Sequence, residues 1–311
     1  MNTIPHLGEI LALATAMFWA VAVILFKKSG ETVHPIALNL FKSLLATVLI
    51  LPTVMLIEGG TIPDFSRRDV VLLLVSGALG IGIADTLFFM MLNRLGAALS
   101  SIVDCVYSPM VIAAAMIWLG ERLGWLQLVG VVLIVSAVWE AMHVPQTPPN
   151  PPASRGESEG SAGARGNRRW IGVLWGISAM ACMAVGIVMM KPILDTYSLL
   201  WVLEVRLVGG IAVLLLILAF NPKRREILGT LFVKQGWGYL LSGSFIGAYL
   251  ALILWVAGIK YTQASQASAL NQTSNIFVFI LAGVFLKERM TKQRVIGIGL
   301  AVIGVYLVTF G

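Results

Sequence analysis

A carboxylate stands inside an otherwise apolar segment at residues 101–109, which read SIVDCVYSP. An ionised carboxylate surrounded by hydrocarbon is costly, so such a group normally faces a bundle interior or an aqueous cavity and pairs with another group. Asp104 is followed by Tyr107, whose hydroxyl can donate or accept a hydrogen bond. Both residues are therefore candidates for binding a polar substrate or for ion coupling.

Two further charges lie at a similar depth in neighbouring apolar segments. Counted inward from the ends of their segments at 1.5 Å per residue, Lys42, Asp85 and Asp104 each lie about 10 Å deep. Two carboxylates then share one amine, and the carboxylate left over can hold or release a proton, as a proton-coupled carrier requires. The aspartate that pairs with Lys42 is neutralised, so Lys42 would decide which of the two carboxylates remains unpaired. The alternative is that Lys42 and one aspartate form a structural ion pair.

The second half of the chain carries a comparable pair of charges near the opposite side. Arg206, with Glu204 two residues before it, lies about six residues into an apolar segment, so this layer balances one Glu against one Arg. Side chains at positions i and i+2 leave a helix about 200° apart, so Glu204 and Arg206 do not face each other. We therefore expect at least one of them to find a partner on another segment. Arg206 and Lys42 can also hold a substrate carboxylate, Arg206 by two parallel hydrogen bonds and Lys42 as a point charge.

Amides and tryptophans complete the set of candidate binding residues. Spacing of i, i+3, i+4 and i+7 places four polar side chains on one helical face: Ser268, Asn271, Gln272 and Asn275. These side chains can bind a substrate. The alternative is that they only form hydrogen bonds between helices, each of which contributes about 0.6–2 kcal/mol. Trp19 and Trp255 fall within apolar segments, where they wall a cavity or simply pack.

Membrane-spanning helices must position these residues. The chain of 311 residues is 58% hydrophobic and 12% charged, whereas soluble domains average about 45–50% apolar and about 25% charged residues. Apolar blocks long enough to cross about 30 Å of hydrocarbon recur along the chain. We therefore expect an all-α polytopic membrane protein. Its ten transmembrane helices are predicted at 8–26, 36–57, 70–92, 97–120, 125–142, 170–190, 198–220, 237–259, 263–286 and 293–310.

The two halves of the chain are related in sequence. WLGERLGWLQLVGVVLIVSAVW (118–139) aligns without gaps with FLKERMTKQRVIGIGLAVIGVY (285–306), a sign of an internal repeat. At the repeat offsets Arg206 corresponds to Lys42, Asn271 to Asp104 and Leu252 to Asp85. Because each half has an odd number of helices, we expect two inverted five-helix repeats, as in many secondary transporters. They occupy residues 1–142 and 170–311, joined by a disordered Pro/Gly/Ser/Arg linker at 143–169.

The doubled five-helix unit, the LGER (119–122) and LKER (286–289) motifs and the basic residue in helices two and seven resemble the EamA-domain family. That family belongs to the drug/metabolite transporter (DMT) superfamily, and the resemblance covers both halves without the linker. It implies a carrier of small metabolites, often an exporter, with helices one to four and six to nine around a central cavity. Helices five and ten would lie to one side. At the helix ends, structural charge pairing is the favoured role of Glu121–Arg122 and Glu288–Arg289.

Several functional classes are disfavoured by composition and spacing. The three histidines lie at block ends, and the two cysteines show no metal-ligand or disulfide spacing, so we expect no metal, no cofactor and no enzyme chemistry. No P-loop is present, which excludes a self-contained ATP-driven pump. The net charge of +7 is better explained by loops facing anionic lipid than by nucleic acid.

The predicted function is secondary transport of small polar metabolites, amino acids first, by alternating access. Export with proton coupling is the expected mode, in a bacterial inner membrane, with the small-molecule substrate and membrane lipid as partners. A homo-oligomer is left open. The loops on the side of the linker hold most of the 22 Lys and Arg residues, which places that side in the cytoplasm. The alternatives are an efflux carrier for lipophilic cations or drugs and a membrane sensor or scaffold.

Overall fold

The computed structural model describes residues 6–59, 61–119, 124–143, 160–262, 264–288 and 290–310, which are mainly helical and contain no β-strand. The first half contains α1 (Leu7–Ser29), α2 (Pro35–Glu58), α3 (Arg67–Gly77), η1 (Ala78–Ala84), α4 (Asp85–Leu95), α5 (Ala97–Asp104), α6 (Tyr107–Leu119) and α7 (Trp125–His143). The second half contains α8 (Gly160–Thr196), α9 (Leu199–Phe220), α10 (Arg224–Gly229), η2 (Thr230–Phe232), α11 (Trp237–Gly243), η3 (Ser244–Ala251), α12 (Leu252–Tyr261), α13 (Ala264–Asn271), α14 (Ser274–Phe285) and α15 (Lys292–Phe310).

Many of these helices are membrane-spanning by length and composition. Within the described ranges, seven helical runs are long and apolar enough to cross a membrane: Leu7–Ser29, Pro35–Glu58, Arg67–Leu95, Ala97–Trp118, Arg169–Thr196, Leu199–Phe220 and Trp237–Tyr261. Two shorter apolar helices are Trp125–Glu140 and Ser274–Phe285. The chain is therefore an all-α, multi-pass integral membrane protein.

The structure differs from the sequence prediction at the end of the linker. Helix α8 begins at Gly160, inside the segment 143–169 that was predicted to be disordered. The part of that segment after Pro152 contains no proline, so a helix can extend backwards from the apolar span that begins near Arg169. Residues 144–159 of the predicted linker lie outside the described residues.

The two halves share the same backbone irregularities at a constant offset. The segments η1 and η3 are π-helical and end at Ala84 and Ala251, 167 residues apart. Helix α5 ends at Asp104 and α6 begins at Tyr107, and the corresponding helices α13 and α14 end and begin 167 residues later. The internal repeat seen in the sequence is therefore also present in the backbone.

The helix break after Asp104 lies close to Pro109, and a proline inside a helix can kink it. At this break Cys105 N donates to Ile102 O (3.3 Å), and at the matching break Thr273 N donates to Leu270 O (3.1 Å). Both are tight i→i−3 turns. The second break lacks a proline, because Ile276 stands at the position that corresponds to Pro109. Pro109 is therefore not the general cause of the break, which belongs to the repeated fold.

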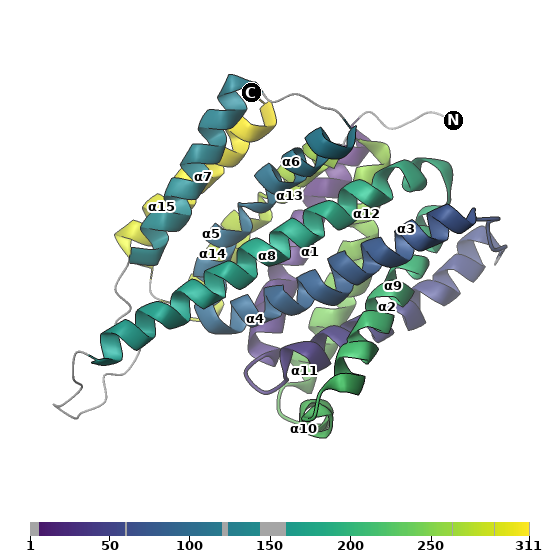
Figure 1. Ribbon diagram of the computed structural model, residues 1–311, viewed down its shortest axis with the longest axis horizontal. Coiled ribbons are helices and arrows are strands. Elements are labelled where there is room, and N and C mark those ends of the chain that lie inside the picture. The colour runs from purple at the N-terminus through teal and green to yellow at the C-terminus, as the bar shows by residue number, and fades with distance from the viewer. Residues whose placement is uncertain are drawn as a thin grey trace.

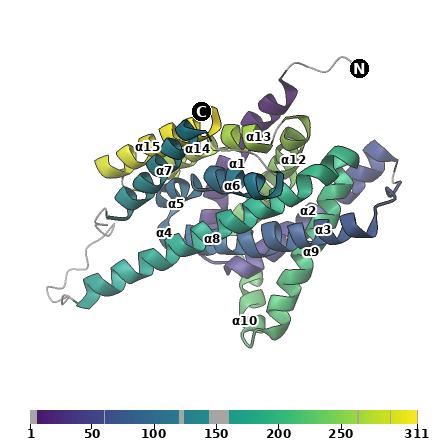
Figure 2. The ribbon, with the colours of Figure 1, turned by 45° about the horizontal axis from the view of Figure 1, so that its top comes forward.

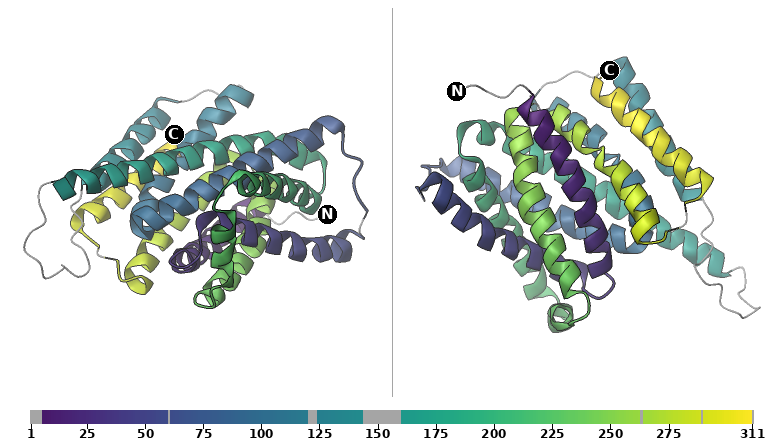
Figure 3. Two further views of the ribbon diagram at one scale, coloured as in Figure 1. Left: turned by 60° about the horizontal axis from the view of Figure 1, so that its bottom comes forward. Right: turned by 180° about the vertical axis from the view of Figure 1, so that it is seen from behind.

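The halves interlock around the centre of the bundle. Helix α1 of the first half packs on α12 and α14 of the second, whereas α8 packs on η1, α4 and α6 of the first (Figure 3). Helices α7 and α15 pack chiefly on each other and form a pair at one side (Figures 1 and 2). Helix α1 starts and α15 ends at one end of the bundle, called the terminal end, and α10 and the start of α8 lie at the opposite end, called the linker end (Figure 1).

Candidate functional site

A cavity of about 100 Å³ lies between the two halves, and it is lined by helices of both. Nine of the eleven candidate residues line it: Trp19, Lys42, Asp85, Asp104, Tyr107, Arg206, Trp255, Asn271 and Gln272. Glu204 and Asn275 do not. Charged groups from four different helices, α2, α4, α5 and α9, thus face one enclosed space.

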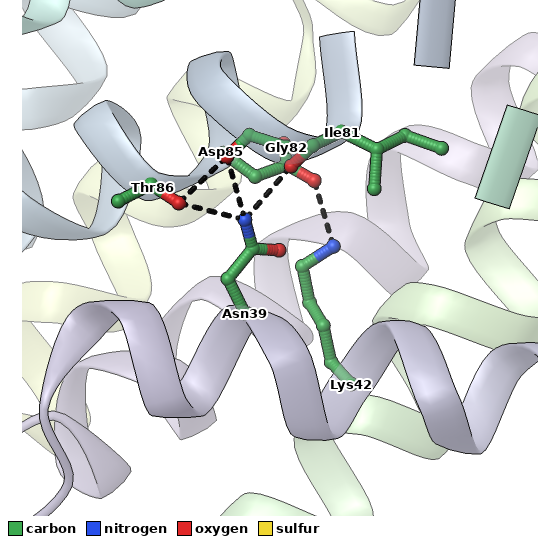
Figure 4. A network of polar contacts seen from close by, with 6 residues as sticks. All are labelled: Asn39, Lys42, Ile81, Gly82, Asp85 and Thr86. Atoms are coloured by element: carbon green, nitrogen blue, oxygen red, sulfur yellow. Dashed lines mark hydrogen bonds and ion pairs between the residues drawn. The ribbon is translucent and has the colours of Figure 1, made fainter. Parts of the chain in front are cut away.

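Lys42 and Asp85 form the closest charge pair in this wall. The Nζ atom of Lys42 donates to Oδ2 of Asp85 at 2.7 Å, and both side chains are buried (Figure 4). Asp85 is the first residue of α4, directly after the π-helical segment η1. The sequence placed these residues at one depth but left open which aspartate pairs with Lys42, and the structure selects Asp85.

Asn39 holds α2 against the same segment, and the sequence prediction missed it. Its Nδ2 atom donates to Ile81 O (2.8 Å), Gly82 O (3.1 Å) and Thr86 Oγ1 (2.9 Å) (Figure 4). The signal was present, because Asn39 precedes Lys42 by three residues and so shares its helical face. Asn39 fixes the position from which Lys42 reaches Asp85.

Asp104 lies at the C-terminal end of α5, where the helix breaks beside the cavity. Asn275 of α14 lines a small pocket together with Asp104. In the described part of the chain, no Lys or Arg forms an ion pair with Asp104. Asp104 is therefore the carboxylate left over in this layer.

Arg206 reaches the same cavity through a close approach of two backbones. A Cβ atom on Gly77 of α3 would lie 1.8 Å from Arg206 O, so α9 can pack this closely only against glycine. The guanidinium donates to Met190 Sδ at 2.9 Å, and its Nε has no hydrogen-bond partner. Asp85 neutralises Lys42 in the first repeat, but the corresponding residue in the second repeat is Leu252. Arg206 consequently forms no ion pair within the described residues.

The structure separates the surroundings of Arg206 and Glu204. Arg206 lines the cavity and Glu204 does not. Glu204 is 4% exposed, and its Oε1 has no partner among the described residues. The two side chains leave the helix about 200° apart, so one points to the cavity and the other into packing.

The amides also do not form one continuous face, because the helix breaks at Gln272 and Thr273. Asn271 and Gln272 line the central cavity, and the Asn271 Oδ1 atom is buried without a partner. Asn275 lies beyond the break, where its Nδ2 donates to Gln272 Oε1 at 2.7 Å. It lines a second, smaller pocket together with Trp19 and Asp104.

The LKER motif is placed at the linker end, outside the cavity. The two carboxylate oxygens of Glu288 accept hydrogen bonds from the backbone N–H groups of Ala97 (2.8 Å) and Ala98 (3.1 Å), the first residues of α5. Arg294 Nη1 lies 3.9 Å from the same carboxylate. Glu121, Arg122 and Arg289 lie outside the described residues. Among the described residues, Glu288 thus pairs with Arg294 and caps α5.

Chemically, the site offers charged groups and hydrogen-bond donors and acceptors. Within the described ranges, no three His, Cys, Asp or Glu side chains cluster as metal ligands. A paired Lys42–Asp85, a separate anion at Asp104 and a separate cation at Arg206 share one cavity between two interlocked halves. Charged groups that face one cavity between two packed halves of a helical membrane protein are typical of transporters.

The chain belongs to the EamA-like transporter family, whose profile matches residues 6–141 and 170–310. It is accordingly a transporter of the DMT type. An uncharacterised transporter of Archaeoglobus fulgidus is 23% identical over 300 residues, with 96% of each chain covered. The uncharacterised transporter YetK of Bacillus subtilis is 30% identical over 128 residues, which cover 41% of this chain and 38% of YetK. A solved crystal structure shares the fold with a TM-score of 0.67 at 14% identity, covering 97% of this chain and 96% of the other.

Proposed function

We propose that the protein is a secondary active transporter that exports small zwitterionic metabolites, such as amino acids, by alternating access coupled to protons. The observation that carries this proposal is that Asp104 and Arg206 line one cavity without an ion-pair partner in the described part of the chain. A ligand with one ammonium and one carboxylate group satisfies both.

The charge balance of the cavity supports a zwitterion. Lys42 and Asp85 neutralise each other, which leaves one negative and one positive group. Arg206 can bind a carboxylate through two parallel hydrogen bonds, and Asp104 can accept from an ammonium group. The Asn271 Oδ1 atom, buried without a partner, offers a further acceptor. The cavity volume of about 100 Å³ suits a small metabolite, because drug-sized ligands occupy roughly 300–1,000 Å³.

We propose that transport uses ten transmembrane helices arranged as two inverted repeats. The repeated π-helical segments and helix breaks, and the reciprocal packing of α1 and α8, support this arrangement. Broken helices that meet at a central site are typical of inverted-repeat carriers, in which one half rocks against the other. The positive charge of the linker-end loops supports a cytoplasmic linker end, and a bacterial inner membrane is the proposed location.

Proton coupling rests on Asp104. Because Lys42 is occupied by Asp85, Asp104 has no fixed positive partner among the described residues and can alternate between a proton and the ammonium group of a substrate. Exchange of one for the other would link outward substrate movement to inward proton movement.

A second candidate is efflux of lipophilic cations. Trp19, Phe88, Tyr107 and Trp255 line the cavity beside Asp104, and aromatic rings with a carboxylate favour a cation. Arg206 and the small volume oppose this function. A sensor or scaffold would show no transport at all.

The test is transport by the purified protein in lipid vesicles with an imposed pH gradient and a panel of labelled amino acids. We expect gradient-driven flux of at least one of them. Arg206→Gln should raise its KM by at least about tenfold, because a charge-assisted bond to the carboxylate is lost. Arg206→Lys should recover only part of the affinity. Flux of lipophilic cations but not of amino acids would favour the second candidate function. Flux that is unaffected by collapse of the pH gradient would exclude proton coupling.

A further inference from the structure

A second pocket of about 10 Å³ adjoins Asp104 and extends along α5 toward the linker end. It shares Trp19, Phe88 and Asp104 with the central cavity. Its remaining wall includes Ala97, Ser100 and Ser101 of α5. The Asp104 carboxyl group therefore stands at the boundary between the substrate cavity and this pocket.

The pocket has the polar lining that a buried water molecule requires. Ser100 is 2% exposed, and its Oγ atom has no hydrogen-bond partner within the described ranges. Ser100 and Ser101 precede Asp104 by four and three residues, so the three side chains lie on one side of α5. Asn275 lines the same pocket from α14. A site of roughly 10–15 Å³ with two to four polar partners can hold one water molecule. The pocket meets both conditions.

The pocket also reaches the start of α5, beside Glu288 at the linker end. Ala97, which lines it, is the first residue of α5, and its N–H group donates to Glu288 Oε1 at 2.8 Å. At 1.5 Å per residue, Asp104 lies only about 10 Å from Ala97 along the helix. One bound water covers much of this distance.

We propose that the pocket is a water-binding site through which Asp104 exchanges its proton with the linker end, separately from the substrate cavity. A proton that leaves the Asp104 carboxyl group is taken up by the bound water, which releases one of its own protons to solvent water at the linker end. The water is regenerated and a carboxylate remains. This inference rests on the proposed proton coupling and adds to it the site and the side of proton exchange.

The charged and titratable groups around Asp104 are few in the described part of the chain. Cys105 and Tyr107 belong to its own helical run, Lys42 and Asp85 neutralise each other across the cavity, and Arg206 faces it from α9. The residues that α1, α8 and α14 contribute to the two pockets are uncharged. From α15 and the loop before it, Arg294 and Glu288 pair with each other at the linker end.

The second repeat indicates a conservative way to remove the water site. The residue that corresponds to Ser100 is Ala267, which is fully buried in α13 at the same helical position. Alanine is thus accommodated there, and Ser100→Ala should fold normally. Asn271 likewise corresponds to Asp104, so Asp104→Asn is a tolerable reference variant. Ser244→Ala is a matched control, because Ser244 has a buried hydroxyl without a partner and lines neither pocket.

The experiment measures proton exchange at Asp104 by infrared spectroscopy of the full chain in lipid vesicles without substrate. The carbonyl band of the protonated carboxyl group is identified by its loss in Asp104→Asn, and its shift is followed after transfer to D₂O. We expect Ser100→Ala to slow this shift by about tenfold, because the water loses one of its hydrogen-bond partners. Ser244→Ala should exchange at the wild-type rate.

An unchanged rate in Ser100→Ala would overturn the water site. Absence of any Asp104 band at low pH would overturn it as well, because Asp104 would then carry no proton. If no labelled amino acid crosses the vesicle membrane but Ser100→Ala still slows the shift, the water site stands and the transport proposal fails. If transport occurs and Ser100→Ala leaves the rate of the shift unchanged, the transport proposal stands and the water site fails.

Discussion

The Nζ atom of Lys42 lies 2.7 Å from Oδ2 of Asp85, and this contact joins α2 to the start of α4 in the wall of the central cavity. Because Lys42 is occupied in this way, Asp104 is the one of these two aspartates that has no ion-pair partner among the described residues. The contact therefore separates two aspartates that lie at the same depth into one with a structural role and one available to ligands.

The first prediction concerns Asp85→Asn. We expect this variant to lower the free energy of unfolding by about 3–5 kcal/mol, because the buried ammonium group of Lys42 loses its counter-charge. Reversible unfolding in detergent micelles measures the change. Asp104→Asn is the matched control and should change the free energy of unfolding by less than about 1 kcal/mol, since no ion pair is lost. Equal losses in both variants would show that Lys42 does not distinguish the two aspartates.

The second prediction concerns removal of both partners. Lys42→Met combined with Asp85→Leu should be much less destabilising than the sum of the single changes, because no buried charge is left alone. Leucine already occupies the position that corresponds to Asp85, at Leu252. A double-mutant cycle measures the coupling. Additive losses would mean that the two side chains do not stabilise each other.

The third prediction concerns the contact between α3 and α9. Gly77→Ala should destabilise the protein by about 1–3 kcal/mol or more, because the new Cβ would collide with the Arg206 carbonyl and push α9 away. Thermal unfolding in detergent checks this. Gly238→Ala is the control, since a Cβ there meets nothing within 4 Å. It should be neutral or slightly stabilising, and a similar loss in both variants would refute the steric explanation.

The fourth prediction concerns pH and His34, which precedes α2 outside the membrane-spanning segments. Burial lowers the pKa of His34, with Glu226 opposing this, and its Nδ1 accepts a hydrogen bond from Ile36 N. A protonated ring cannot accept that bond. The stability that His34 contributes is therefore fully present above its ordinary pKa of about 6.5 and is lost as the pH falls from there through the lowered pKa of the folded state. The melting temperature should fall more steeply with acidification in the wild type than in His34→Asn, which keeps a cap without titrating. Parallel pH profiles would contradict this.

The fifth prediction concerns Glu288, which caps α5 at the linker end. Glu288→Ala should destabilise α5 by about 1–2 kcal/mol, because the N–H groups of Ala97 and Ala98 lose their acceptor. Hydrogen exchange of the peptide that covers α5 should become faster, while exchange in α12 stays unchanged. Glu288→Gln keeps one acceptor oxygen, so its exchange rate in α5 should lie between those of the wild type and Glu288→Ala. A uniform increase across the chain would indicate general destabilisation instead of a lost cap.

The sequence alone determined the class of the protein, the repeat and the depth of the polar residues. Apolar segments need a minimum length to cross a membrane, and each residue advances a helix by 1.5 Å, so Lys42, Asp85 and Asp104 could be placed in one layer by counting. The alignment of the halves likewise identified Leu252 and Asn271 as the counterparts of Asp85 and Asp104.

Only the tertiary structure decided which side chains meet. The direction of a side chain depends on helix rotation, and the π-helical segment η1 and the break after Asp104 both change the rotation expected from a regular helix. Counting therefore could not choose Asp85 over Asp104 as the partner of Lys42, nor predict that Asn275 leaves the face of Asn271. The close approach at Gly77, which brings Arg206 to the cavity while Glu204 points elsewhere, depends on contact between α3 and α9. Helix packing sets such contacts, and local sequence does not encode them.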